Sequence, residues 1–159
     1  MNSPNPDVAR LRQALHSANR HERAQAAVEL GKQGDRDSLD ELRVMANDPD
    51  DVVAVSAIFG CWQLGETTLP VDRVAASLAS ADEEKVQLAV QALCTMGAAV
   101  VPKLVTLLDA GSPYALSIVQ VLADIGGPES RKAVERITRS GDPSLADAAR
   151  TVLADWSDD

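Results

Sequence analysis

The stretch that decides the fold runs from residue 48 to residue 65 and reads DPDDVVAVSAIFGCWQLG. Asp48-Pro49 opens it, a mostly apolar segment follows, and Leu64-Gly65 closes it. Asp before Pro is typical of a helix N-cap followed by the first helical position. Gly after the last apolar residue is typical of a helix end, because Gly adopts a left-handed conformation without a Cβ clash. The stretch therefore predicts one complete α-helix with both ends marked.

The closing pair recurs along the chain, with glycines 34, 32 and 29 residues apart. Counting back from each Gly, the residues one, four and seven positions earlier are apolar, which traces one stripe of an α-helix. The residue six positions earlier is Gln in three copies and Phe59 in the other. Four segments therefore predict the same amphipathic helix. Their closing pairs are Leu30-Gly31, Leu64-Gly65, Met96-Gly97 and Ile125-Gly126.

Between these helices the apolar spacing predicts shorter second helices, and an opening and a final helix complete the set. Further starts are predicted at Ser112-Pro113 and Asp142-Pro143, and at a capping box from Ser80 to Glu83. About ten helices in about five repeats predict an all-α fold, a right-handed α-α superhelix. Residues 6–156 are expected to form one domain, with residues 1–5 and 157–159 flexible. The shorter second helices are expected at 36–46, 69–79, 98–109 and 128–139, and the outer two helices at 6–17 and 143–156.

Composition and charge narrow the function. Apolar residues make up 45% of the chain and only four residues are aromatic, which suits closely packed helices better than a β-sandwich. A formal charge of −9 opposes binding to a phosphate backbone, so no nucleic-acid partner is expected. No apolar run approaches the roughly 20 residues of a membrane span. The first ten residues are polar, unlike a secretory signal. We expect a soluble, cytoplasmic protein without membrane contact.

The stretch from Asp48 to Gly65, with its Asp-Pro start and Leu-Gly end, resembles the short HEAT-like repeat of phycobilisome lyases and many bacterial proteins. Weaker copies extend the resemblance over about residues 18–156. Such repeats serve mostly as interaction surfaces, so the resemblance implies a solenoid that binds another protein. Ankyrin and tetratricopeptide repeats fit less well, because their diagnostic residues are absent.

No arrangement of residues predicts catalysis or a bound cofactor or metal. His21-Glu22 is similar to a repeat of deoxyhypusine hydroxylase, where several His-Glu pairs hold two irons, but the matching positions here carry no ligands. His21-Glu22 is then an ordinary first-turn pair. Cys61 and Cys94 lack zinc spacing and are expected to be buried. No nucleophile motif or phosphate loop is present.

One candidate contact surface is the basic helix at 128–139, which carries Arg131, Lys132, Arg136 and Arg139. Second helices of HEAT-like solenoids usually line the concave face, so these cations would meet a partner. The alternative is a solvated face held by pairs such as Glu135–Arg139.

The other candidate surface is aromatic. Phe59 stands in a column of glutamines, with Trp62 one turn later. If that column is exposed, the two rings form an edge suited to a partner. The alternative is that a neighbouring repeat covers them. Trp156 is expected to cap the last repeat.

Together these features predict a non-catalytic protein-interaction module, a scaffold or adaptor, without cofactor. The alternative function is that of an accessory subunit in a bilin lyase-type, chromophore-handling complex.

Overall fold

A computed structural model describes residues 6–157, which form ten α-helices and three short 3-10 helices, with no strand in that range. This confirms the predicted all-α class. The chain divides into two compact units, unit 1 up to Arg73 and unit 2 from Val74. The single domain and the right-handed superhelix therefore stay predictions. The flexible ends predicted at 1–5 and 157–159 lie outside the described residues except for Ser157, which donates its N–H to Ala154 O and so closes the last turn.

Unit 1 is built around one helix that is apolar on every side. This helix is α4 (Asp51–Gln63), in which every residue from Val52 to Cys61 is buried. A helix that is hydrophobic all round requires burial all round. Within unit 1, α4 packs against α2 and α3, and α2 also packs against α1. The other elements of unit 1 are α1 (Pro6–Ala14), α2 (Arg20–Lys32), η1 (Arg36–Ser38) and α3 (Leu39–Met45). The predicted opening helix 6–17 thus ends three residues early.

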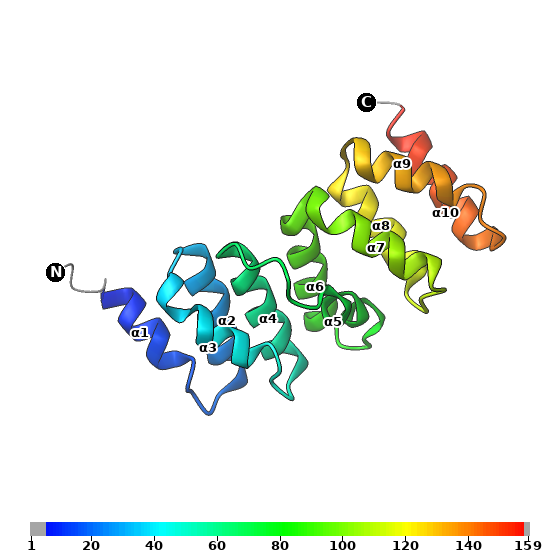
Figure 1. Ribbon diagram of the computed structural model, residues 1–159. Coiled ribbons are helices and arrows are strands. Elements are labelled where there is room, and N and C mark those ends of the chain that lie inside the picture. Colours follow the sequence, from blue (N-terminus) through cyan, green and yellow to red (C-terminus); the bar gives the residue numbers. More distant parts are fainter. Residues whose placement is uncertain (1–5, 158–159) are drawn as a thin grey trace. The chain divides into compact units, whose positions relative to one another are not determined.

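The boundary between the units falls inside α5 (Val71–Ala76). In unit 2, α8 contacts α6, α7, α9 and α10, while α9 contacts α7, α8 and α10. Helices α6, α8 and α10 thus form one row, and α7 and α9 pack beside it (Figure 1). The elements of unit 2 are η2 (Ser77–Ala79), α6 (Glu83–Met96), η3 (Gly97–Val100), α7 (Val101–Asp109), α8 (Ala115–Ile125), α9 (Gly127–Ile137) and α10 (Pro143–Asp155).

Three of the four predicted glycine ends are confirmed. Gly65, Gly97 and Gly126 have φ angles of +90°, +60° and +63°, so each takes the left-handed conformation directly after a helix. The prediction for Gly31 is wrong. This residue lies inside α2, which runs on to Lys32, and Gly34 with φ +72° follows the helix instead. Gly31 has a different role, because it lies against Gly60 of α4.

Of the N-caps predicted at Asp48, Ser80, Ser112 and Asp142, only Asp142 is confirmed, and its side chain accepts from the N–H groups of Ser144 and Leu145. At the other three starts the cap lies two residues later than predicted. Asp50, not Asp48, caps α4, and Asp82, not Ser80, caps α6. Asp48 instead accepts from the N–H of Asp50, which forms the turn before the helix. In α8 the N-cap position is held by Tyr114 rather than by Ser112.

The residues from Glu83 to Asp109 are long and apolar enough, by length and composition alone, to cross a membrane. They do not form one continuous helix. Gly97 ends α6 with a positive φ, and η3 and α7 follow as separate elements.

Candidate protein-interaction surfaces

The predicted aromatic edge does not form. Phe59 is only 1% exposed, so its ring is not available to a partner, and the alternative of a covered ring is correct. The physical reason is the all-round burial of α4. Trp62 lies one turn further on and is half-buried. The apolar residues that flank Phe59 on every side of α4 are the sequence signal for this burial.

The structure separates the four predicted cations of the basic helix. Arg131 turns towards the end of α10, where its guanidinium lies 5.8 Å from the centre of the Trp156 ring and donates to Trp156 O at 3.3 Å. Arg136 pairs with Asp109 of α7 at 2.7 Å. Among the described residues, neither Lys132 nor Arg139 forms an ion pair, so the predicted Glu135–Arg139 pair is absent.

Lys132 and Arg136 meet at a groove between α7 and α9, which we call the cationic groove. It has a volume of about 330 Å³. Its apolar surface comes from Val101, Pro102 and Val105 of α7 and from Ala133 of α9. Its charged edge consists of Lys132, Arg136 and Glu129, all exposed.

A second groove of about 370 Å³ lies between α8 and α10 of the other row, and we call it the acidic groove. The sequence alone does not predict this groove. Ten positions before the closing Gly, Leu116 stands where the other copies have His21, Val55 and Gln87. In the structure Leu116 is 53% exposed. The apolar lining is Leu116, Val119, Ala123, Ala148, Val152 and Trp156, and the polar lining is Gln120, Asp124, Thr151 and Asp155.

Two charged clusters join elements of unit 1. Arg12 of α1 pairs with Asp35 and Asp37, and its guanidinium lowers the pKa of Asp35. Arg73 donates to Ala46 O and Asp48 O and pairs with Asp51, which fixes the turn between α3 and α4. These contacts lie within unit 1 and join segments 22 to 27 residues apart along the chain.

The surroundings of both cysteines favour the neutral thiol. Cys61 is buried, and burial raises the pKa of its thiol to about 11. Cys94 is half-buried, and burial also raises its pKa. A thiol whose pKa is raised by apolar surroundings is a poor nucleophile, because the thiolate is the reactive form. Within residues 6–157, no three His, Cys, Asp or Glu side chains gather as a metal site.

Comparisons with known proteins were made for the whole chain. No protein-family model matches it, and no curated protein matches it. Among solved structures it is similar to an engineered protein from the Northeast Structural Genomics Consortium, with 21% sequence identity and a TM-score of 0.46. That match covers 97% of this chain and 79% of the engineered protein. At this TM-score the likeness carries no argument about fold or function.

Proposed function

We propose that the chain is a non-catalytic protein-interaction module, a scaffold or adaptor. Its cationic groove would receive an acidic amphipathic segment of another protein. The observation that carries the proposal is the placement of Lys132 and Arg136 along one apolar groove between two neighbouring helices. Apolar surface with a few convergent charged groups is what a helical segment with one apolar face recognises.

The repeat architecture belongs to the same proposal. Three helices that end at glycines, α4, α6 and α8, alternate with the helices between them, and in unit 2 the helices form two rows. This alternation supports a HEAT-like solenoid, in which each repeat contacts its neighbours and the exposed helices offer an extended binding surface. The resemblance of the stretch from Asp48 to Gly65 to such repeats supports it further.

A partner can bind the cations of the cationic groove without breaking a strong contact within the protein. Lys132 is exposed and has no ion pair among the described residues. The Arg136–Asp109 pair is exposed on both sides, at 52% and 61%, and such surface pairs contribute little to stability. A partner carboxylate can therefore take the place of Asp109. Because the whole chain carries a charge of −9, an acidic partner is repelled elsewhere and attracted only where cations gather.

The test uses a pair of labelled peptides of about 18 residues, long enough to form a helix when bound. Both have leucines along one helical face. In the Glu/Leu peptide the remaining positions are mainly glutamate, and in the Lys/Leu peptide they are lysine. Fluorescence anisotropy of the labelled Glu/Leu peptide would measure its binding to the full chain. We expect the double variant Lys132→Glu plus Arg136→Glu to bind this peptide at least about fivefold more weakly, as the loss of two surface charge contacts implies.

The matched control is Arg10→Glu plus Arg36→Glu, which changes the net charge equally but lies in unit 1. This control should bind the Glu/Leu peptide nearly as well as the wild type. Equal weakening by both double variants would assign the effect to overall charge and refute the proposal for this groove.

A further inference from the structure

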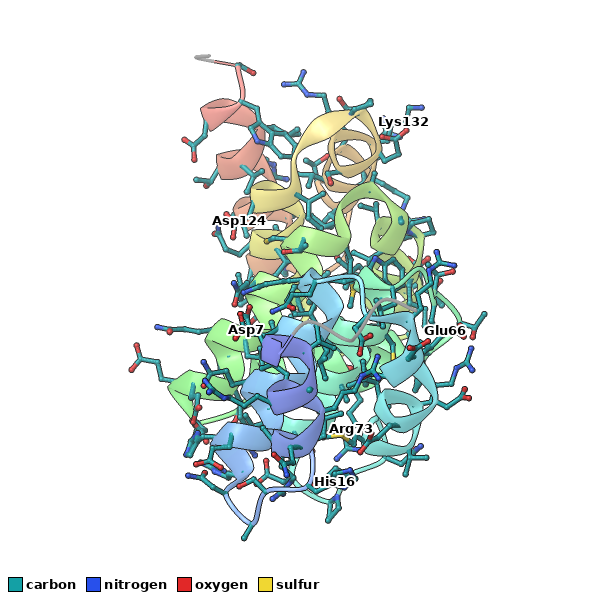
Figure 2. All side chains as sticks on the ribbon, turned by 90° about the vertical axis from the view of Figure 1, so that its left-hand side faces the viewer. Asp7, His16, Glu66, Arg73, Asp124 and Lys132 are labelled. Carbon is teal, nitrogen blue, oxygen red and sulfur yellow. The ribbon has the colours of Figure 1, made fainter. Side chains whose placement is uncertain are left out.

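We infer that the acidic groove is a second docking surface, which receives a basic amphipathic segment of another protein. It lies on a different part of unit 2 from the cationic groove. In Figure 2, Asp124 of the acidic groove and Lys132 of the cationic groove are on opposite sides of this unit. The inference goes beyond the proposed function and stands or falls without it.

One apolar residue of the acidic groove, Leu116, is unusually exposed for this protein. Leu116 and Val44 are the two strongly exposed large aliphatic residues among those described, and Val44 belongs to unit 1. The groove is also lined by Val119 and Val152, which are almost fully buried. An apolar side chain from a partner would cover Leu116, which removes apolar area from water.

Trp156 gives the groove a fixed wall. Its ring is half-buried, lines the groove, and lies 5.8 Å from the guanidinium of Arg131. Arg131 also donates to the main-chain oxygen of Trp156. Two contacts from α9 thus hold this residue before any partner arrives. An aromatic side chain already held in place loses little conformational entropy on binding, which favours its use as an anchor.

Charge decides which segment the groove accepts. Asp124 is the next-to-last residue of α8 and Asp155 is the last residue of α10, and both are exposed. The C-terminal end of a helix already carries partial negative charge, so a carboxylate there adds to it and a cation is favoured. Neither helix has a basic residue in its last turn, and no basic residue lines the groove. The lining therefore offers lysine or arginine side chains two carboxylates and two helix ends.

No cation pairs with either carboxylate among the described residues. Asp124 Oδ1 accepts from the neutral amide of Gln120 at 3.3 Å, and Asp155 has no ion pair among the described residues. The edge of the groove is net negative, whereas that of the cationic groove is net positive. The two grooves thus select segments of opposite charge, and unit 2 can hold both at once.

The test uses the full chain with Trp62→Phe, which leaves Trp156 as the single tryptophan. The probe is the tryptophan-free Lys/Leu peptide defined above. We expect the emission of Trp156 to change on titration and the labelled peptide to gain anisotropy with the same Kd. Asp124→Asn plus Asp155→Asn should weaken binding at low salt by about fivefold, and high salt should reduce this difference because it screens exposed charges.

Two further variants keep the result interpretable. Glu83→Gln plus Glu135→Gln removes the same charge elsewhere in unit 2 and should leave binding unchanged. Asp124→Lys plus Asp155→Lys should reverse the preference, so that the Glu/Leu peptide binds this groove instead and changes the emission of Trp156. Far-UV circular dichroism shows whether each variant is folded.

Several outcomes would overturn the inference. They are no change in Trp156 emission, equal weakening by the Glu83/Glu135 control, or no reversal of preference in the lysine variant. Sedimentation of the free chain is a further measurement. A dimer that the Asp124/Asp155 variants dissociate would assign the groove to a second copy of this chain and refute a foreign segment. Binding of the Glu/Leu peptide to the cationic groove is unaffected by these variants, so the failure of one proposal does not decide the other.

Discussion

At positions 31 and 60 the main chains of α2 and α4 approach so closely that a side chain has no room. A Cβ atom on Gly60 would lie 2.4 Å from the carbonyl oxygen of Ala27, and one on Gly31 would lie 2.7 Å from the Cα of Gly60. Contacts this short with main-chain atoms cannot be relieved by rotating a side chain. The two helices touch through their backbones, which explains why Gly31 lies within a helix.

We expect Gly60→Ala to destabilise the protein by about 2 kcal/mol, because the added methyl group overpacks the crossing. In an unconstrained helix the same substitution would stabilise by up to about 1 kcal/mol. A loss of stability would therefore identify overpacking at the crossing as the cause. Urea denaturation followed by circular dichroism measures the change. Gly141→Ala is the control, since a Cβ there meets nothing within 4 Å. A Gly60→Ala protein as stable as the wild type would show that the helices can separate freely.

The carboxylate of Glu66 provides a residue-scale prediction for pH. Hydrogen bonds from the Thr68 hydroxyl and from Arg43, whose Nη2 lies 2.6 Å away, lower the pKa of Glu66 to about 2. Figure 2 shows Glu66 at the edge of unit 1. Because the fold favours the ionised form, this stabilisation is present above the ordinary carboxyl pKa near 4.5 and is lost as the pH falls towards 2.

The variant Glu66→Gln should therefore have a lower Tm than the wild type at neutral pH. The difference should shrink steadily as the pH is lowered from about 5 to about 2, where the wild-type carboxyl also becomes neutral. Thermal melts at a series of pH values measure it. A difference that stays constant over this range would show that Glu66 acts by packing and not by charge.

At the scale of the elements, helix starts depend on which of several neighbouring polar side chains reaches the free N–H groups. Asp48, Asp50 and Asp51 are all close to the start of α4, and Asp50 makes the capping bonds, to the N–H groups of Val52 and Val53. Its other oxygen accepts from Arg20 of α2 at 3.2 Å. The cap thus also joins two helices of unit 1.

We expect Asp50→Ala to cost about 1 kcal/mol or more, because two N–H groups lose their acceptor and the contact with Arg20 is removed. Asp50→Asn keeps an acceptor for the N–H groups and should cost less, since Asn caps about as well as Asp. The free energies of unfolding of the two variants, measured by chemical denaturation, distinguish the contribution of the cap from that of the charge. Equal losses in both would mean that the ion pair with Arg20, rather than the cap, carries the effect.

The helices themselves could be predicted because apolar spacing depends only on local sequence. Their ends were predicted less well, since a Gly or an Asp has several possible roles that tertiary contacts decide. Gly65 and Gly31 each follow a leucine, yet Gly65 ends a helix and Gly31 lies at a helix crossing. Nothing in the local pattern distinguishes them, because the difference is the presence of Gly60 on another helix.

The candidate surfaces were predicted in part for the same reason. Lys132 and Arg136 lie on one helix, so their common face followed from the spacing alone. The acidic groove brings together residues about 30 positions apart, such as Asp124 and Asp155, and that pairing requires knowledge of the packing. The column of glutamines predicts an exposed side chain at position 59, whereas Phe59 is buried because α4 is apolar on every face.

At the scale of the whole molecule, stability should differ along the chain because each helix has different neighbours. We expect the amides of α4 to exchange with deuterium most slowly in unit 1, and those of α8 in unit 2. Both are central helices with buried residues, whereas α1 and α10 are the outer helices of their units. Hydrogen exchange with mass spectrometry tests this order. Faster exchange in α4 than in α1 would contradict the packing described for unit 1.

The contact between Arg131 and Trp156 has a thermodynamic consequence for the two grooves. One helix, α9, supplies Lys132 and Arg136 to the cationic groove, and through Arg131 it holds the Trp156 wall of the acidic groove. A ligand that shifts α9 in one groove therefore changes the affinity of the other. By linkage, each ligand must alter the other's binding constant by the same factor. Arg131→Ala, which breaks the connection, should bring that factor towards one.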